Sequence, residues 1–592
     1  MPALPRRAMT RRSLLAAAAA GGGALAVSRI VPAWAAPPRW PDATVFALDV
    51  GALDRSGAHL ADAWHDSAQL HAPHRFDLVG VQWSGAADAA IQLRARRQGA
   101  DWSAWTEAGF CRGHAPDRVS DPRLIGEPVW TGSADLVQVR SDRPIRGVRL
   151  HFVNATGTAT PAARARRALT GPARVAALRL ARPRYAAGPG QPPIIAREVW
   201  AAGHAAPRRL PDLGEVRLAF VHHTETANAY SRGDSPAMIR AIFHYHRDVE
   251  GWDDIGYNFL VDRFGQIFEG REGGIDEAVV GAQAGGYNLV STGVGTLGSF
   301  QVTREPAGAQ RATAHLLAWK LALHGVPTEG RVTVRVDPSG ARYTNFRAGA
   351  RVTLPRVAGH RDGDSTDCPG NALYHQLPAI RTQVSALAGP RSELTLTPPS
   401  TPSAPSVMLV GQLRLGDRPV SGATIEIQER ARRGRQALGN AVTGVDGTWS
   451  VTVALSRRAT LRAATRGDGH HPAVLSNDFE ILPSASIQLQ AVAAPAPAST
   501  PGAGAGMPAR SIAVSGTIAP APASGRVTVG LFAVNSSASP TPVLRRRVTV
   551  SGGSFSVTLA VPGPGHYRVV ASSAADRSNA AGASAPVDVV IT

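Results

Sequence analysis

Two separated segments of the chain hold side chains that suit a metal site. His222 and His223 stand side by side in a Val-His-His-Thr sequence, and His360 and Cys368 belong to a Gly- and Asp-rich segment at 359–370. Imidazole and thiolate groups are preferred ligands of tetrahedral Zn²⁺, and three protein ligands leave the fourth position to water. An open position is typical of a catalytic zinc ion. The pattern therefore predicts hydrolytic chemistry.

The backbone around these residues limits which of them can act together. Successive residues of a strand point to opposite faces, so His222 and His223 cannot readily bind one ion from an extended strand. One is a ligand and the other a packed or outer neighbour, and the residues alone do not decide which. His360 and Cys368 are eight positions apart, and the loop between them is long enough to turn both side chains inward.

The N-terminus carries the pattern of an export signal. A twin-arginine sequence at 10–15 is followed by an apolar run at 14–27 and an Ala-Trp-Ala cleavage site at 33–35. The run is short and interrupted by glycine, whereas a membrane span needs about 20 apolar residues. A cleaved signal peptide over 1–35 is therefore favoured over an anchor. No later stretch predicts a membrane span, and we expect a secreted, extracytoplasmic, wall-associated protein.

The two cysteines offer a competing interpretation of the site. In an exported protein, Cys111 and Cys368 would by default form a disulfide, which would remove Cys368 as a ligand. Twin-arginine export carries folded proteins, which is compatible with a metal site assembled beforehand. We favour the ligand role for Cys368 and expect Cys111 to be a buried thiol.

Length and charge set the general class. A chain of 592 residues is too long for one core and predicts several domains. Its formal net charge of +19 comes almost entirely from arginine, which attracts polyanions such as acidic wall polymers. The basic segment 159–192 is either a solvated connector or an adhesive surface. No helix-turn-helix, zinc-finger or RNA-binding signature is present, so nucleic acid is not an expected partner.

The remaining sequence divides into domains. Alternating strands separated by turn residues predict an all-β sandwich at 40–158. Its Trp83, Trp102 and Trp105 could stack on sugar rings, although burial in the core is the more frequent role. Residues 193–388 carry the α/β pattern, which predicts a mixed central sheet with flanking helices, a hairpin at 257–269 and a helix at 309–324 ending at Gly325.

Pro- and Ser-rich linkers are expected at 389–405 and 491–508, bounding two modules at 406–490 and 509–592. The modules resemble each other. Gly411 corresponds to Gly516, and the sequence at 447–453 corresponds to that at 553–559. Each module is predicted to be a small β-sandwich, loosely resembling immunoglobulin-like or carboxypeptidase-regulatory-like extracellular modules, with a spacer or wall-contact role.

The α/β segment resembles the zinc-dependent N-acetylmuramoyl-L-alanine amidases of the peptidoglycan recognition protein, or amidase-2, family. The resemblance rests on five blocks, at 221–224, 252–259, 281–286, 293–295 and 359–370. The β domain before it looks like the companion domain of secreted actinobacterial members.

The resemblance implies roles for particular residues. His222, His360 and Cys368 match the family's zinc ligands, which leaves His223 as a neighbour. Tyr257 matches the tyrosine that faces the bound water and the substrate carbonyl. Thr366 takes the position that threonine or lysine occupies in active members. These two residues would stabilise the developing oxyanion.

The implied activity is hydrolysis of the amide bond between N-acetylmuramic acid and L-alanine in peptidoglycan, by a protein that we expect to be monomeric. The zinc-bound water is the expected source of the proton for the leaving amine, and the residue that relays it stays open: His223 or His246 could do so, although a structural role is favoured for each. Gln283 stands where the family commonly has histidine, a change expected to affect the groove rather than the ligands. Two alternatives are a non-catalytic muropeptide-binding module, disfavoured by the presence of Cys368 and Tyr257, and a thiol hydrolase with Cys368 as nucleophile.

Overall fold

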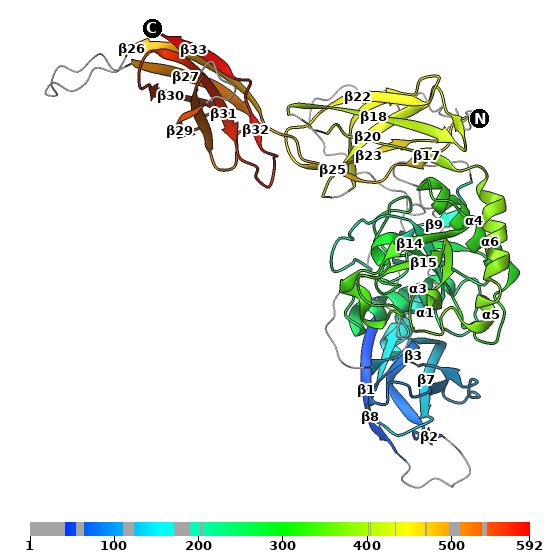
Figure 1. Ribbon diagram of the computed structural model, residues 1–592. Helices are drawn as coiled ribbons and strands as arrows, with labels where there is room; N and C mark the ends of the chain where they lie inside the picture. The colour runs from blue at the N-terminus through cyan, green and yellow to red at the C-terminus, as the bar shows by residue number, and fades with distance from the viewer. Residues whose placement is uncertain are drawn as a thin grey trace, which may run out of the picture.

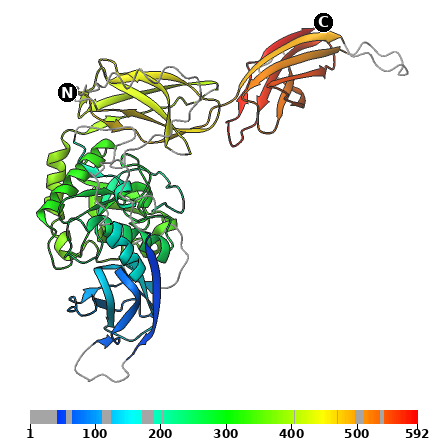
Figure 2. The ribbon, with the colours of Figure 1, turned by 180° about the vertical axis from the view of Figure 1, so that it is seen from behind.

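Four folded units follow one another along a bent, extended molecule (Figures 1 and 2). The signal peptide expected at 1–35 and Cys111 lie outside the residues that the structure describes. A computed structural model describes residues 42–54, 64–109, 124–170, 190–201, 205–400, 402, 404–432, 434–467, 470–495, 510–534 and 541–592.

The N-terminal unit is all-β, as expected. Its elements are β1 (Thr44–Leu53), β2 (His65–Asp66), β3 (Leu70–Gly85), β4 (Ile91–Arg96), β5 (Thr106–Glu107), β6 (Leu124–Ile125), β7 (Val129–Ser141) and β8 (Ile145–Asn154), followed by helix α1 (Pro161–Thr170). The described strands form one antiparallel sheet ordered β1-β8-β3-β7-β4-β5, not two separate sheets. Register shifts between β3 and its neighbours bend it around a common core.

The tryptophans of this unit occupy two environments. Trp83 is fully buried, and its indole N–H donates to the carbonyl of Ala86 at 3.0 Å. Trp102 and Trp105 are half-buried and carry arginines on their rings, with the Arg94 guanidinium 5.0 and 4.5 Å from the two ring centroids. The core role is therefore confirmed for Trp83. The other two rings stack on protein cations.

The second unit has the expected mixed sheet with flanking helices. Its elements are β9 (Ile194–Ile195), α2 (Arg197–Ala201), β10 (Leu218–His223), α3 (Ser235–His244), π-helix η2 (Tyr245–Val249), β11 (Phe259–Val261), β12 (Ile267–Glu269), η3 (Asn288–Val290), β13 (Ser291–Thr296), α4 (Ala307–Leu323), β14 (Arg331–Arg335), η4 (Pro338–Tyr343), β15 (Arg351–Pro355), β16 (Val357–Gly359), η5 (His360–Asp362), α5 (Asn371–Tyr374) and α6 (Leu377–Ala388). The sheet order is β16-β10-β13-β11-β12-β9.

Packing of this sheet agrees with the sequence pattern. Helices α4 and α6 share a core with one face of the sheet, and α2 and α3 share a second core with the other. The hairpin forms between β11 and β12, which are antiparallel within an otherwise parallel sheet. Gly325 follows α4 with a φ of 63°, a left-handed conformation that glycine adopts without strain.

The first two units are joined by a common core. Leu78, Trp130 and Val153 of the β domain pack with residues of α3 and η2. The Tyr245 hydroxyl donates to the carbonyl of Gly126 at 2.8 Å. Gly80 makes room for this contact, because a Cβ there would lie 1.9 Å from the Tyr245 hydroxyl. The β domain is therefore packed firmly against the α/β domain.

The two C-terminal modules are each built from two antiparallel sheets. Module 1 contains β17 (Ser392–Leu394), β18 (Ser406–Leu415), β19 (Arg418–Pro419), β20 (Thr424–Arg430), β21 (Arg435–Val442), β22 (Thr448–Ala454), β23 (Ala459–Thr465), β24 (Val474–Leu475) and β25 (Phe479–Ile481). Module 2 contains β26 (Ser486–Pro495), β27 (Arg510–Ala519), β28 (Arg526–Ala533), β29 (Thr541–Thr549), β30 (Ser554–Ala560), β31 (Gly565–Ser573), β32 (Gly582–Ala583) and β33 (Val587–Ile591). The immunoglobulin-like resemblance stays a prediction.

The sequence repeat corresponds to one recurring contact. Gly411 lies opposite Trp449 in the β18–β22 pair, and Gly516 lies opposite Phe555 in the β27–β30 pair. A Cβ at either glycine would lie 2.4 or 2.5 Å from the facing aromatic ring. Each glycine therefore provides the space into which an aromatic residue of the neighbouring strand folds.

Three expected linkers contain regular structure. Helix α1 lies within 159–192, of which 171–189 are outside the described residues. Strand β17 lies within 389–405 and pairs with β18. Strand β26 begins before the expected 491–508 linker and pairs with β27, so it belongs to module 2 rather than module 1. Pro- and Ser-rich composition predicted the last two linkers, but pairing of β17 and β26 to neighbouring strands outweighed it.

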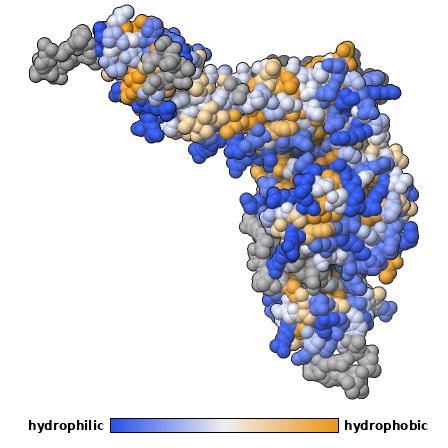
Figure 3. Space-filling view, in the orientation of Figure 1, coloured by the Kyte–Doolittle hydropathy of each residue, from blue (hydrophilic) through white to orange (hydrophobic). Residues whose placement is uncertain are grey.

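Hydrophilic side chains cover most of the face shown in Figure 3, with hydrophobic residues dispersed among them. In the described ranges, every helix is too short or too polar to span a bilayer.

Candidate metal centre

The proposed ligands meet at one edge of the α/β sheet. His222 is the second-to-last residue of β10, and His360 directly follows β16, which is parallel and adjacent to β10. Parallel neighbours place their carboxyl ends at the same edge. Cys368 comes from the loop before α5. One ligand atom from each of the three lies within 4.8 Å of the others, and all three residues are buried. The Cys368 Sγ is 3.6 Å from His222 Nδ1.

A chain of hydrogen bonds fixes the orientation of the His222 ring. Ser291 Oγ donates to the Tyr287 carbonyl at 2.9 Å, so it accepts from the Gln283 amide nitrogen, 3.0 Å away. The Gln283 Oε1 therefore faces His222 Nε2, at 2.5 Å, and accepts its proton. This leaves the lone pair of His222 on Nδ1, directed toward Cys368.

The second histidine has a similar outer contact. His360 Nε2 lies 3.1 Å from the carboxylate of Asp364. Burial raises the pKa of Asp364 to about 8, so a cation near His360 would favour its ionised form. A metal-binding histidine usually donates its second ring N–H to such an acceptor. Two oriented imidazoles and one thiolate sulfur fit a tetrahedral zinc ion with an open position.

The position of Gln283 corrects one expectation. Gln283 was predicted to affect the groove, but it is fully buried and contacts His222, one of the proposed ligands. Gly293 provides its space, because a Cβ there would lie 2.5 Å from the Gln283 side chain. The expectation failed because the fold brings Gln283 into contact with His222 and with Ser291 of β13. Sequence spacing does not reveal these contacts.

We expect Gln283→Leu to weaken zinc binding by about 10- to 100-fold, the usual cost of losing an outer hydrogen bond to a ligand. Gln283→His retains an acceptor nitrogen and should bind zinc more tightly than the leucine variant. Competition with a fluorescent chelator measures both affinities. Gln98→Ala, at an exposed position in the β domain, is the control. Wild-type affinity in Gln283→Leu would contradict this role.

The two residues predicted to act beside the metal lie near the ligands. Tyr257 is 1% exposed, with its ring centroid 5.5 Å from that of His222. Its hydroxyl donates to the His223 carbonyl at 3.4 Å, a long contact. The Thr366 hydroxyl accepts from the backbone N–H of Cys368 at 3.1 Å and thereby orders the ligand loop. Their catalytic roles stay predictions.

The two remaining histidines differ in their surroundings. His223 accepts from the N–H of Phe300 at 3.2 Å and pairs with Glu225 at 2.9 Å. His246 stacks on Trp252, with ring centroids 4.4 Å apart. Of the two, His223 alone lines the cavity beside the ligands.

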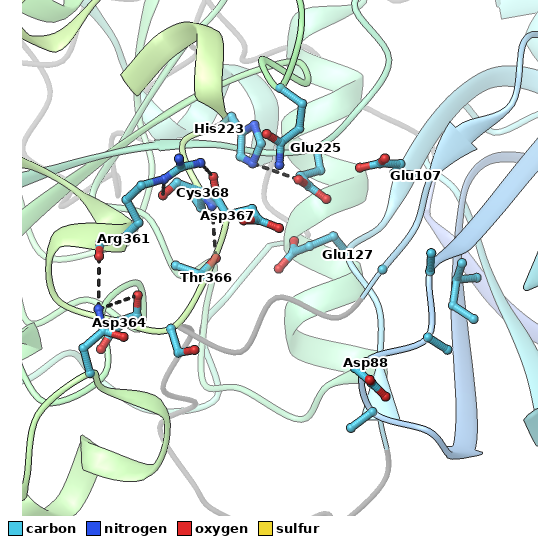
Figure 4. Close-up of a pocket in the computed structure, with 18 residues that line it drawn as sticks. Asp88, Glu107, Glu127, His223, Glu225, Arg361, Asp364, Thr366, Asp367 and Cys368 are labelled. Atoms are coloured by element: carbon cyan, nitrogen blue, oxygen red, sulfur yellow. Dashed lines mark hydrogen bonds and ion pairs between the residues drawn. The ribbon is translucent and has the colours of Figure 1, made fainter. Parts of the chain in front are cut away.

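A cavity of about 680 Å³ opens beside the ligands, between the α/β domain and the N-terminal β domain (Figure 4). Cys368 and Thr366 line it on one side, and Asp88, Glu107 and Glu127 of the β domain line it on the other. No sequence pattern indicated this second wall, since nothing in the spacing of these acids points to the proposed metal ligands. Cys368 forms no disulfide within the described residues.

Comparison with known proteins agrees with this architecture. Residues 212–371 match the N-acetylmuramoyl-L-alanine amidase family, and residues 43–171 match the Rv3811 N-terminal galactose-binding domain-like family. Peptidoglycan-recognition protein 2 of Holotrichia diomphalia is 30% identical over 192 residues, which cover 32% of this chain and 87% of that protein. The chain therefore belongs to the amidase-2 family, which includes peptidoglycan recognition proteins.

Two further relatives match over less than half of their own length. Peptidoglycan-recognition protein LE of Drosophila melanogaster is 30% identical over 184 residues, 31% of this chain and 45% of its own length. The N-acetylmuramoyl-L-alanine amidase of Mus musculus is 34% identical over 196 residues, 32% of this chain and 31% of its own length. The chain thus spans less than half the length of these two relatives.

Proposed function

We propose that this protein is a zinc-dependent amidase that hydrolyses the bond between N-acetylmuramic acid and L-alanine in peptidoglycan. The observation that carries the proposal is the buried group of His222, His360 and Cys368, which reaches a cavity through Cys368. The family match supports the same activity. Peptidoglycan is accordingly the proposed partner of the cavity.

The residues of the site have separate proposed roles in metal binding, ligand orientation and oxyanion stabilisation. A zinc ion held by the two imidazoles and the thiolate would supply Lewis acidity and a nucleophilic water at neutral pH. Gln283 and Asp364 hold the rings of His222 and His360 in the tautomers that present Nδ1. The hydroxyls of Tyr257 and Thr366 are the proposed donors to the developing oxyanion, where a fixed donor contributes most.

Digestion of purified peptidoglycan tests the proposal. The zinc-loaded protein should release free stem peptides that begin with L-alanine, detected by mass spectrometry. Removal of zinc with o-phenanthroline should stop the release, and added zinc should restore it. New reducing ends would instead indicate a glycosidase.

Two other functions predict different results in the same experiment. A recognition module would bind peptidoglycan and leave its glycan–peptide bonds intact, consistent with relatives that are named recognition proteins. A thiol hydrolase would stay active after chelation and lose activity to a thiol-blocking reagent. Restoration by zinc separates the amidase from both.

The location and wider contacts of the protein belong to the same proposal. We propose twin-arginine export, a wall-associated location, and contact of the basic segment 159–192 with anionic wall polymers. A monomer is the expected state in solution.

A further inference from the structure

One wall of the cavity belongs to a domain outside the matched amidase segment. Asp88, Glu107 and Glu127 of the β domain face Cys368 and Asp367 across the cavity (Figure 4). A molecule that reaches the proposed metal centre through this cavity therefore passes between the two domains. These carboxylates share the cavity with Cys368, one of the three residues of the proposed metal-binding group.

The second wall is held in place. The two domains share one buried core around α3 and η2, and the Tyr245 hydroxyl bonds to the Gly126 carbonyl, adjacent to Glu127. Glu107 lies next to Ala108, which is fully buried. The backbone that carries these acidic side chains is therefore packed against the α/β domain.

The charge of the cavity is strongly one-sided. Among the described lining residues, six are carboxylic acids and Arg361 is the one arginine. The Arg361 guanidinium donates to the Cys368 carbonyl and to Asn371 Oδ1, within its own loop. Burial, together with the charges of Glu225 and Asp367 across the cavity, raises the pKa of Glu107. The carboxylates thus lie close enough to influence one another.

This inference rests on the proposed function and adds a substrate class to it. We propose that the acidic wall formed by Glu107 and Glu127 makes the cavity select stem peptides that carry a free ammonium group. A cation in the cavity relieves the repulsion among the carboxylates, whereas an added carboxylate increases it. Cross-linking converts the side-chain amine of a stem peptide into a neutral amide. The preferred substrate is therefore an uncross-linked stem.

A matched pair of synthetic substrates tests the selection. N-acetylmuramoyl-L-Ala-D-isoGln-L-Lys has a free side-chain amine, and its Nε-acetyl analogue is neutral there. We expect wild type to prefer the free amine by about tenfold in kcat/KM. Binding to the full-length, metal-free protein, measured by calorimetry, should show the same preference. The preference should shrink in 0.5 M NaCl, which screens charges beyond a few ångströms.

Substitutions in the acidic wall test whether it causes the preference for the free-amine substrate. Glu107→Gln should reduce it, and Glu107→Gln/Glu127→Gln should bring the two substrates close to equality. Asp49→Asn removes the same charge from β1, where the carboxylate is 74% exposed and pairs with Arg149, and should leave the preference unchanged.

The outcomes separate this inference from the proposed function. Hydrolysis of both substrates at equal rates would overturn the selection and leave the amidase standing. Selective binding of the free amine without any hydrolysis would support the selection and reject the amidase. A preference that survives the double substitution, or disappears equally in Asp49→Asn, would overturn the role of the wall.

Discussion

The Cys368→Ser variant is expected to lose amide hydrolysis by about 10³-fold or more, because Lewis-acid stabilisation is worth several kcal/mol and about 1.4 kcal/mol is a factor of ten. Cys368 is 3% exposed, and its Sγ faces His222 Nδ1 at 3.6 Å. A serine hydroxyl is a much weaker zinc ligand than a thiolate. Zinc content by elemental analysis should therefore fall together with the release of stem peptides.

Cys111→Ser is the matched control, since it removes the other cysteine of the chain. It should retain both zinc and activity. Equal losses in the two variants would indicate that the cysteines act as a pair, and would contradict the ligand role of Cys368. Loss of activity in Cys368→Ser with zinc content unchanged would instead favour a nucleophilic thiol.

The second large effect is expected where module 1 contacts the α/β domain. Glu277 of the α/β domain accepts two hydrogen bonds from Arg462 of β23, both at 2.9 Å, and a further one from Arg435 of β21 at 3.2 Å. The side chains of all three are 2–3% exposed. Burial opposes ionisation of Glu277, but the two arginines outweigh it and lower its pKa.

Glu277→Gln would leave the buried guanidinium groups of Arg462 and Arg435 without their counter-charge. A third cation, Lys320, also lies here and donates to the Glu277 carbonyl at 2.7 Å. We expect a loss of about 3–5 kcal/mol in the free energy of unfolding of this region. Urea denaturation followed by tryptophan fluorescence measures it. Limited proteolysis should also detect earlier separation of module 1 from the α/β domain.

Glu393→Gln provides the control. Glu393 pairs with Arg391 at 3.4 Å, and both side chains are close to half exposed, so the change should cost less than about 1 kcal/mol. Similar stability losses in the two variants would show that the buried contact is not what holds module 1. The expected result would mean that module 1 is docked on the α/β domain, not suspended from it by a linker.

Local sequence patterns were sufficient to predict many of the strands and helix ends of the fold. Alternation located β4 and β8, and Gly325 marked the end of α4. Strand parity required His222 and His223 to have different partners, and in the structure they do: His222 faces Cys368, and His223 pairs with Glu225. These features depend on neighbours within a few positions, so a short segment contains all the information that specifies them.

Residue types and spacing by themselves predicted a donor set for the proposed zinc site, divided between a strand end and a loop, and the repeated C-terminal modules, but they left the choice between His222 and His223 open. Only the tertiary structure decided that Gln283 orients His222, that Glu277 joins module 1, and that Glu107 and Glu127 share a cavity with Cys368. Each of these contacts joins residues from segments far apart in the chain. The hydrophobic periodicity of a short segment does not predict such a contact, because the contact arises only when the packing of complete domains brings distant segments together.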